Sequence, residues 1–230
     1  MKKNSNRPPF PWTSVSALLF TAAVLTASVI VYSSGQKERI LRDAVTEMEA
    51  VANLKAEQVS DWRSERLNDA TLIHENVTLV EHIDAMFIKD DSRGEKSRLE
   101  QLLSTLIKNY DFSGAVLVDA GGNPGIAVPE SEAVMGDLLR TSVSRAISNP
   151  VISISDFHTA TVISYLHLDL LIPMRMPYEG DTVLAGVLVI RIDPEKELFP
   201  MLSKWPTPGR TAECILFRFE GDSVIYLNGS

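Results

Sequence analysis

Cysteine is almost absent from this sequence of 230 residues, and its absence excludes two kinds of site. A single Cys214 cannot form an intramolecular disulfide, and it cannot build a metal site from several thiolates. Glycine and proline are also scarce, with 12 of each, which is too few for a loop-rich scaffold. We therefore expect a fold that rests on helices, strands and an apolar core.

Positive charge is in short supply as well. The chain has 22 Lys and Arg against 30 Asp and Glu, which gives a net charge of -8. Nucleic-acid binding requires clustered Lys and Arg, so we expect no nucleic-acid partner. Hydrophobic residues make up 45% of the chain and charged residues 23%, which excludes wholesale disorder. The length suffices for one sizeable core, or for one domain and part of another.

A long apolar run lies near the N-terminus. It extends from Trp12 to Tyr32 without a charge or a proline. A helix of about 20 apolar residues crosses the hydrocarbon core of a bilayer, and the amphipathic rings of Trp and Tyr favour its two interfaces. Residues 12–34 are therefore predicted to form a transmembrane helix in contact with membrane lipid.

The flanking charges set the expected orientation of this helix. Lys2, Lys3 and Arg7 precede it without any acid, and although three basic residues also follow it, we expect residues 1–11 to be a cytoplasmic tail. Residues 35–230 are then periplasmic, and the chain is placed in a bacterial inner membrane. The alternative is a cleaved signal peptide, whose apolar region is about 7–15 residues long and ends at a small-x-small site. The longer run here favours an uncleaved anchor.

The segment that follows the apolar run reads as helix. Residues 36–93 contain neither Gly nor Pro, and their apolar residues recur mostly three, four or seven positions apart. This pattern predicts one long helix, or two stacked ones, with one apolar face. We assign residues 35–93 as the stalk helix of an extracytoplasmic domain. It either transmits displacement to the membrane or simply packs on the domain, and both roles are compatible.

Beyond the stalk the hydrophobic period changes from helical to strand-like. Helices are predicted at 95–109 and 134–147, a turn at 120–125, and strands at 113–119, 151–157, 162–174 and 183–192. This order predicts an α+β fold in which flanking helices cover an antiparallel sheet. Residues 94–204 would form this module. Residues 205–230 would form a Pro-rich connector and the first hairpin of a second, incomplete module.

No catalytic constellation is present. The sequence has no G-x-S-x-G element, no Walker loop and no G-x-G-x-x-G fingerprint. His74 and His82 lie eight residues apart, and a solvated or interhelical role is favoured for them over metal binding. We therefore predict no enzyme activity for this chain, and no metal or cofactor.

The strongest site signal is a polar face on a predicted strand. Tyr165, His167 and Asp169 alternate with apolar residues, so they share one face of the strand. Asp156 and His158 share a face of the preceding strand if that strand extends so far. Such a face suits a small-molecule cavity, although a plain solvated face is the alternative.

Several segments resemble one family, the extracytoplasmic double-Cache (PAS-like) sensor regions of bacterial membrane receptors. They are the stalk element AEQVSDWRSERL, the strand SGAVLVDAGGNP, the strand GVLVIRIDP and the segment WPTPGRTAECILFRFEGDSVIYLN. The last is the most specific, because it is similar to the junction between the two modules of such sensors. The resemblance covers most of residues 12–228.

The resemblance implies a function in signal input. Such sensors, on histidine kinases and diguanylate cyclases, bind a small metabolite in the distal module and are commonly homodimers. The resemblance places Asp156 and Asp193 at ligand-contacting positions, and we add His158, Tyr165 and His167 from the strand pattern. Relatives that bind amino acids carry an Arg-x-Trp-Tyr element, which is missing here.

A sensor histidine kinase is the leading interpretation for the full-length protein. The alternatives are a diguanylate cyclase, a chemoreceptor, and a structural envelope domain without a ligand.

Overall fold

The computed structural model describes residues 12–87, 92–133, 135–159, 165–178, 180–206 and 213–228. The chain divides into two compact units, Met1–Leu54 and Lys55–Ser230. Helix α1 (Trp12–His74) contributes to both.

The first unit is the N-terminal part of α1. Among the described residues, α1 is the one helix long and apolar enough to cross a membrane, and its most apolar stretch of 18 residues has a mean hydropathy of 2.2. Its hydroxyl groups are satisfied within the helix, since Thr21 and Thr26 donate to the carbonyls of Ala17 and Ala22 at 2.9 and 2.8 Å. This arrangement hides polar groups from an apolar surrounding.

Of the two alternatives that the sequence pattern left open for this segment, one long helix or two, the structure has two helices. Helix α1 stops at His74, and the next helix, α2 (Val77–Phe87), begins after Asn76. The Asn76 side chain accepts a hydrogen bond from the Leu79 amide at 3.0 Å, which is the geometry of a helix N-cap. The described residues 35–87 therefore form the end of a long helix and one short helix, and neither Gly nor Pro marks the boundary between them. Helix α3 (Ser92–Asn109) comes next.

The second unit contains a five-stranded sheet with the order β2-β1-β5-β4-β3, in which all neighbouring strands are antiparallel. The strands are β1 (Gly114–Asp119), β2 (Pro124–Val128), β3 (Ser153–Ile154), β4 (Leu168–Tyr178) and β5 (Asp181–Ile192). The 3-10 helix η1 (Glu130–Ala133) and helix α4 (Asp137–Ser148) connect β2 to β3, and α5 (Leu198–Ser203) follows β5. The α+β fold class is confirmed. Strand β2 overlaps a segment predicted as a turn, because its proline and glycine obscure the strand pattern.

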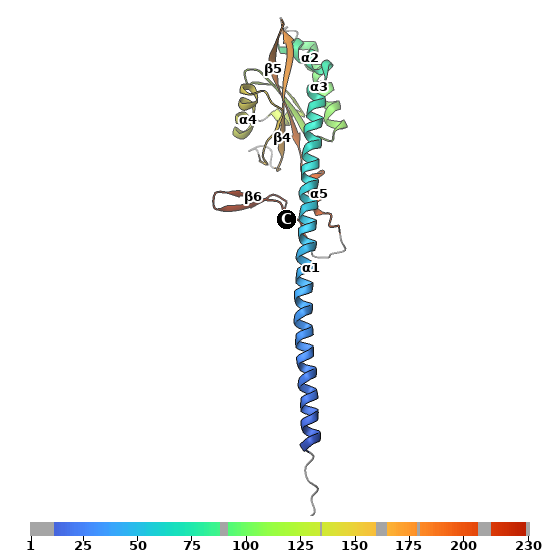
Figure 1. The fold of residues 1–230 in the computed structure, drawn as a ribbon. Helices are drawn as coiled ribbons and strands as arrows, with labels where there is room; N and C mark the ends of the chain where they lie inside the picture. The colour runs from blue at the N-terminus through green and yellow to red at the C-terminus, as the bar shows by residue number, and fades with distance from the viewer. Residues whose placement is uncertain are drawn as a thin grey trace, which may run out of the picture. The chain divides into compact units, whose positions relative to one another are not determined.

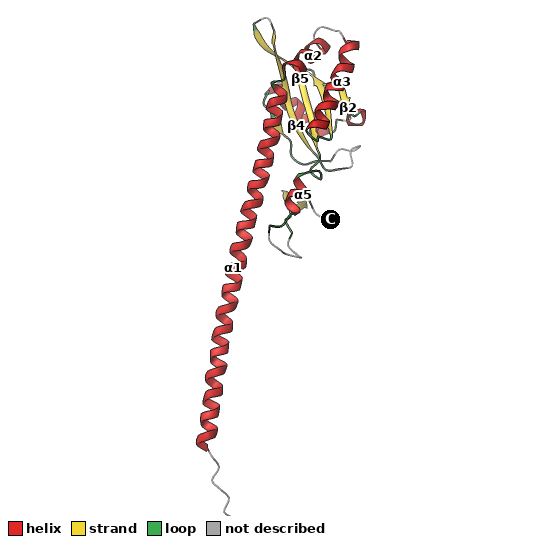
Figure 2. Cartoon of the chain, turned by 90° about the vertical axis from the view of Figure 1, so that its right-hand side faces the viewer, coloured by secondary structure: helices red, strands yellow, loops and turns green. Residues whose placement is uncertain are grey.

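Helices cover both faces of the sheet, so the sheet lies between two apolar clusters (Figures 1 and 2). On one face α2 and α3 pack with apolar residues such as Leu117 and Ile190, and Trp62 of α1 belongs to the same cluster. On the other face α4 contributes Leu139 and Val143. The second face, toward α4, carries the polar residues described below.

The C-terminal hairpin forms a sheet of its own. Strands β6 (Phe217–Glu220) and β7 (Ser223–Tyr226) pair only with each other among the described residues. The side chains of Phe217 and Phe219 are 49% and 73% exposed. Assignment of this hairpin to a second module stays a prediction.

Candidate ligand-binding site

A row of charged residues crosses the otherwise apolar face of the sheet toward α4. Asp169 on β4 lies directly opposite Arg191 on β5, and Arg191 lies opposite Gly114 on β1. Asp169 is 0% exposed and Arg191 is 1% exposed. Apolar side chains such as Val189 and Leu171 continue the same face. The row therefore places opposite charges inside the core, where charged groups are retained only when paired.

Glu132 of η1 adds a second carboxylate to this row, although η1 is not part of the sheet. Its carboxylate pairs with the guanidinium of Arg191, and its side chain is buried. Space for Glu132 exists because β1 has a glycine here: a Cβ atom on Gly114 would lie 2.7 Å from Glu132 Cγ. On the other side, Arg191 Nε lies 3.5 Å from Asp169 Oδ1. Arg191 is thus held between two carboxylates.

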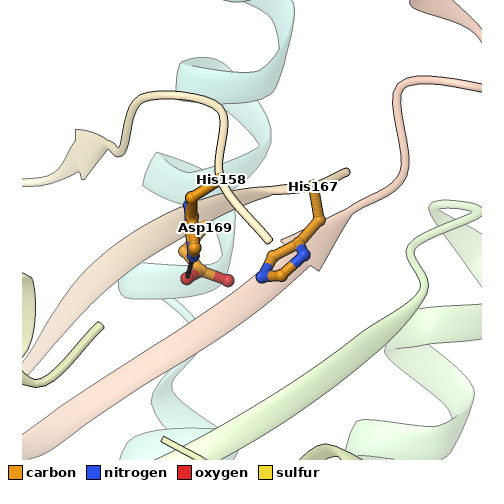
Figure 3. Close-up of side chains that lie close together, drawn as sticks. All are labelled: His158, His167 and Asp169. Atoms are coloured by element: carbon orange, nitrogen blue, oxygen red, sulfur yellow. Dashed lines mark ion pairs between the residues drawn. The ribbon is translucent and has the colours of Figure 1, made fainter. Parts of the chain in front are cut away.

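Two histidines extend the row to the sheet edge. His158 and His167 form an isolated antiparallel bridge, and their ring centroids are 4.2 Å apart. His158 Nε2 lies 3.0 Å from Asp169 Oδ2, and the His167 ring points toward the same carboxylate (Figure 3). The other ring nitrogen of each histidine faces a backbone carbonyl: Nδ1 of His158 lies 2.9 Å from the Asp156 oxygen, and Nδ1 of His167 lies 3.1 Å from the Tyr165 oxygen.

The surroundings shift the pKa values of the titratable groups in different directions. Burial disfavours a charged His158 ring, but its hydrogen bonds to Asp169 and to the Asp156 carbonyl outweigh burial and raise its pKa. Burial lowers the pKa of His167, which favours the neutral ring. Burial, reinforced by the charge of Glu132, raises the pKa of Tyr165 to about 12, so its hydroxyl stays protonated at neutral pH.

A cavity of about 240 Å³ opens beside this cluster. Its floor includes His158, His167 and Arg191, and the start of α4 covers it with Asp137 and Leu138. Gly136, Leu139 and Thr159 complete the lining. The volume lies below the usual range of about 300–1,000 Å³ for drug-sized ligands, so the cavity suits a small metabolite.

The structure brings together some of the residues predicted from the sequence and separates others. His158 and His167 line the cavity, and the Tyr165 ring stacks at a tilt on His167 with centroids 5.5 Å apart. The Asp156 side chain is 69% exposed and pairs with Arg218 at 3.3 Å. Asp193 accepts a hydrogen bond from the Glu195 amide and lines a different hollow. Ligand binding by these five residues stays a prediction.

The polar strand face is buried at this end and not solvated. His167 and Asp169 are both 0% exposed, so the solvated alternative does not describe them. Sequence reasoning left out Arg191 and Glu132. Arg191 could have been found in the sequence, because it is the one charged residue in the apolar strand β5 after Asp181. Glu132 had no such signal, because it reaches the site from an irregular connection.

The other two histidines of the chain have separate environments. His74 Nδ1 lies 2.8 Å from the Pro173 carbonyl oxygen, and His82 pairs with Glu95. Neither belongs to a group of possible metal ligands among the described residues.

Comparison with solved structures identifies the architecture. The structure matches the sensor domain of the histidine kinase DctB of V. cholerae with a TM-score of 0.54 and 13% identity, covering 66% of this chain and 57% of that one. It matches the ligand-binding domain of the Campylobacter jejuni chemoreceptor Tlp3, in complex with 4-methylisoleucine, with a TM-score of 0.51 and 14% identity. That match covers 68% of this chain and 60% of the Tlp3 domain.

Other comparisons set the extent of the likeness. No protein-family model matches the sequence, and no curated protein matches it either. The chain spans about 60% of the length of the sensor domains that it matches. The order of its strands, its long N-terminal helix and these two matches together show that the chain has the fold of the double-Cache sensor domains found in bacterial chemoreceptors and in a sensor histidine kinase.

Proposed function

We propose that this chain is the extracytoplasmic signal-input part of a bacterial transmembrane receptor, and that it senses a small molecule in the cavity beside His158, His167 and Arg191. One observation carries the proposal: charged and imidazole groups are buried together at the wall of a cavity, in a fold that matched receptors use for sensing. Burying such groups is costly, so their position at the wall of a cavity favours a functional role.

The charge of the cluster favours a particular ligand class. Without a metal ion, the cluster has two carboxylates, Glu132 and Asp169, against the one guanidinium of Arg191, and the hydrogen bond to Asp169 helps to raise the pKa of His158. A buried negative charge favours a cationic partner. We expect a small amine-bearing metabolite whose remaining polar groups reach Arg191. The structure of Tlp3 holds 4-methylisoleucine, which is consistent with a ligand of this size.

Signal transfer requires a path to the membrane, and α1 provides one. Its first part is the predicted membrane span, and residues from Lys55 onward belong to the sensor unit. The Lys55 ammonium donates to the carbonyls of Met201 and Lys204, and Trp62 donates to Glu197. Ligand binding would shift α1 only if two arrangements bind the ligand with different affinities.

The receptor is proposed to work as a homodimer. Between the span and the sensor unit, α1 exposes Leu41, Val45 and Met48 at 66%, 55% and 66%. They recur at spacings of four and three, so they form one apolar stripe that a second stalk would cover. The match to DctB favours a histidine kinase as the full-length protein, and the match to Tlp3 favours a chemoreceptor as the second candidate.

A metabolite thermal-shift screen tests the proposal. The full chain in detergent, with metals removed by EDTA, should give a hit that raises Tm by roughly 5–10 °C at a hundredfold excess over Kd. Leu138→Trp should abolish the shift, because Leu138 lines the cavity and is 46% exposed. Leu72→Trp is the matched control, an exposed leucine on α1. Absence of any hit, or a hit that both variants retain, would contradict the proposal.

A further inference from the structure

Three potential metal ligands converge at the edge of the sheet. The donor atoms of His158, His167 and Asp169 all lie within 4.8 Å of one another. His167 and Asp169 are fully buried, and His158 is partly buried. Two imidazoles and one carboxylate form a ligand set that suits zinc and neighbouring divalent transition metals.

The hydrogen bonds of the two rings determine which nitrogen is available. Each Nδ1 faces a backbone carbonyl, which only accepts, so each Nδ1 carries its proton and donates it. In the neutral ring, Nε2 then presents a lone pair. Metal-binding histidines are oriented in this way, with the second nitrogen donating to a carbonyl or carboxylate.

These lone pairs face a carboxylate and need a cation between them. His158 Nε2 lies 3.0 Å from Asp169 Oδ2, and two acceptors at that distance repel each other. A proton on His158 Nε2 would remove the repulsion between His158 and Asp169 only. It leaves His167 Nε2, which is buried and has no hydrogen-bond partner among the described residues. A metal ion satisfies all three groups at once.

The remaining charges permit such a cation. Arg191 Nε lies 3.5 Å from Asp169 Oδ1, which would oppose a metal at that carboxylate. However, Glu132 pairs with Arg191 on its other side and offsets its charge. The distances are also compatible, because neighbouring ligands of a tetrahedral zinc lie ~3.3 Å apart and rotation of the rings closes the difference.

We propose that His158, His167 and Asp169 bind one divalent transition-metal ion, with zinc as the best fit. Both histidines also line the cavity of about 240 Å³, so the fourth coordination position would open into it. A water molecule would complete the coordination there. The inference deepens the proposed sensing function and rests on it for its biological use.

Zinc titration of the full chain tests this inference directly. The protein is purified in detergent without a polyhistidine tag, stripped with EDTA, dialysed, and titrated with ZnCl₂ against a chromophoric chelator. The chain has four histidines, so background sites are few. We expect one tight zinc ion per chain, and Co²⁺ in its place should give the visible absorption of a four-coordinate site. Failure of the wild-type chain to take up one equivalent of zinc would overturn the proposal.

Matched variants assign the site. His167→Asn keeps a donor at the position of Nδ1 but removes Nε2, and it should weaken zinc binding at least about 100-fold. His158→Asn should act in the same way. His74→Asn is the control, because His74 Nδ1 makes the same kind of contact, to the Pro173 carbonyl, outside the cluster. Unchanged zinc affinity in both cluster variants, with circular dichroism showing that they are folded, would refute the assignment.

The screen and the titration separate the two proposals. A metabolite hit in EDTA without zinc uptake would leave the sensing function standing and refute the metal site. Zinc uptake lost in His167→Asn supports the metal site, even if the metabolite screen gives no hit.

Discussion

Replacing Trp62 by alanine tests how strongly the packing of α1 stabilises the sensor unit. The indole is 6% exposed within the main core, and its Nε1 donates to Glu197 Oε2 at 3.0 Å. Loss of a buried Trp side chain costs about 3–5 kcal/mol. The hydrogen bond adds little, because the Glu197 side chain is 54% exposed and water replaces the lost donor. Trp62→Phe should therefore cost only about 1–2 kcal/mol.

Hydrogen exchange in nanodiscs measures this difference at the centre of the sheet. If β5 opens with the whole unit, Trp62→Ala should speed exchange of its core amides roughly 100- to 4,000-fold, since each 1.4 kcal/mol is about a factor of ten. Leu72→Ala on the same helix, where the side chain is 60% exposed, should leave the rates within about threefold. Equal rates in wild type and Trp62→Ala would show that the indole does not stabilise the sensor unit. Equal loss of stability in the alanine and phenylalanine variants would show that burial of the ring is not the cause.

Three further predictions follow from particular residues. Gly114→Ala should lower the free energy of unfolding of the sensor unit by about 1–3 kcal/mol in urea, because the added Cβ would lie 2.7 Å from Glu132 Cγ. Gly94→Ala should instead stabilise α3 by about 0.5–1 kcal/mol, because no other atom lies within 4 Å of the added Cβ. Alkaline phosphatase fused after Arg42 should be active, whereas an inactive fusion beside an active cytoplasmic reporter at the same point would reverse the topology. Amides of β6 and β7 should exchange much faster than those of β5, since a lone two-stranded hairpin is marginal in water; equal protection would assign the hairpin to the first domain.

Much of the fold follows from hydrophobic period alone. The long uncharged run and the switch from helical to alternating spacing were sufficient to predict the α+β architecture. The end of α1 at His74 was not predictable in this way, because it depends on one side chain, Asn76, which caps the next helix. Period indicates where apolar faces lie, but local hydrogen bonds decide where a helix stops.

Only the residues of the candidate site that follow the alternating pattern of one strand could be predicted from the sequence. Alternation correctly placed His167 and Asp169 on one face, and that face is buried against a cavity wall. Its partner Arg191 becomes visible only through the pairing of β4 with β5, which brings residues 22 positions apart in the sequence into direct register. Glu132 depends in addition on the space left by Gly114. Such contacts across strands and loops are a property of the folded chain.

The proposed function requires that a small molecule binds in the cavity between the sheet and the start of α4. Hydrogen exchange of the full chain in nanodiscs, with and without the compound found by thermal shift and with EDTA present, tests it most directly. We expect slower exchange confined to the first turn of α4 and to the backbone around His158, His167 and Arg191. Protection concentrated instead at the hollow lined by Asp193, Arg66 and Tyr110, or no change in exchange at all, would contradict it.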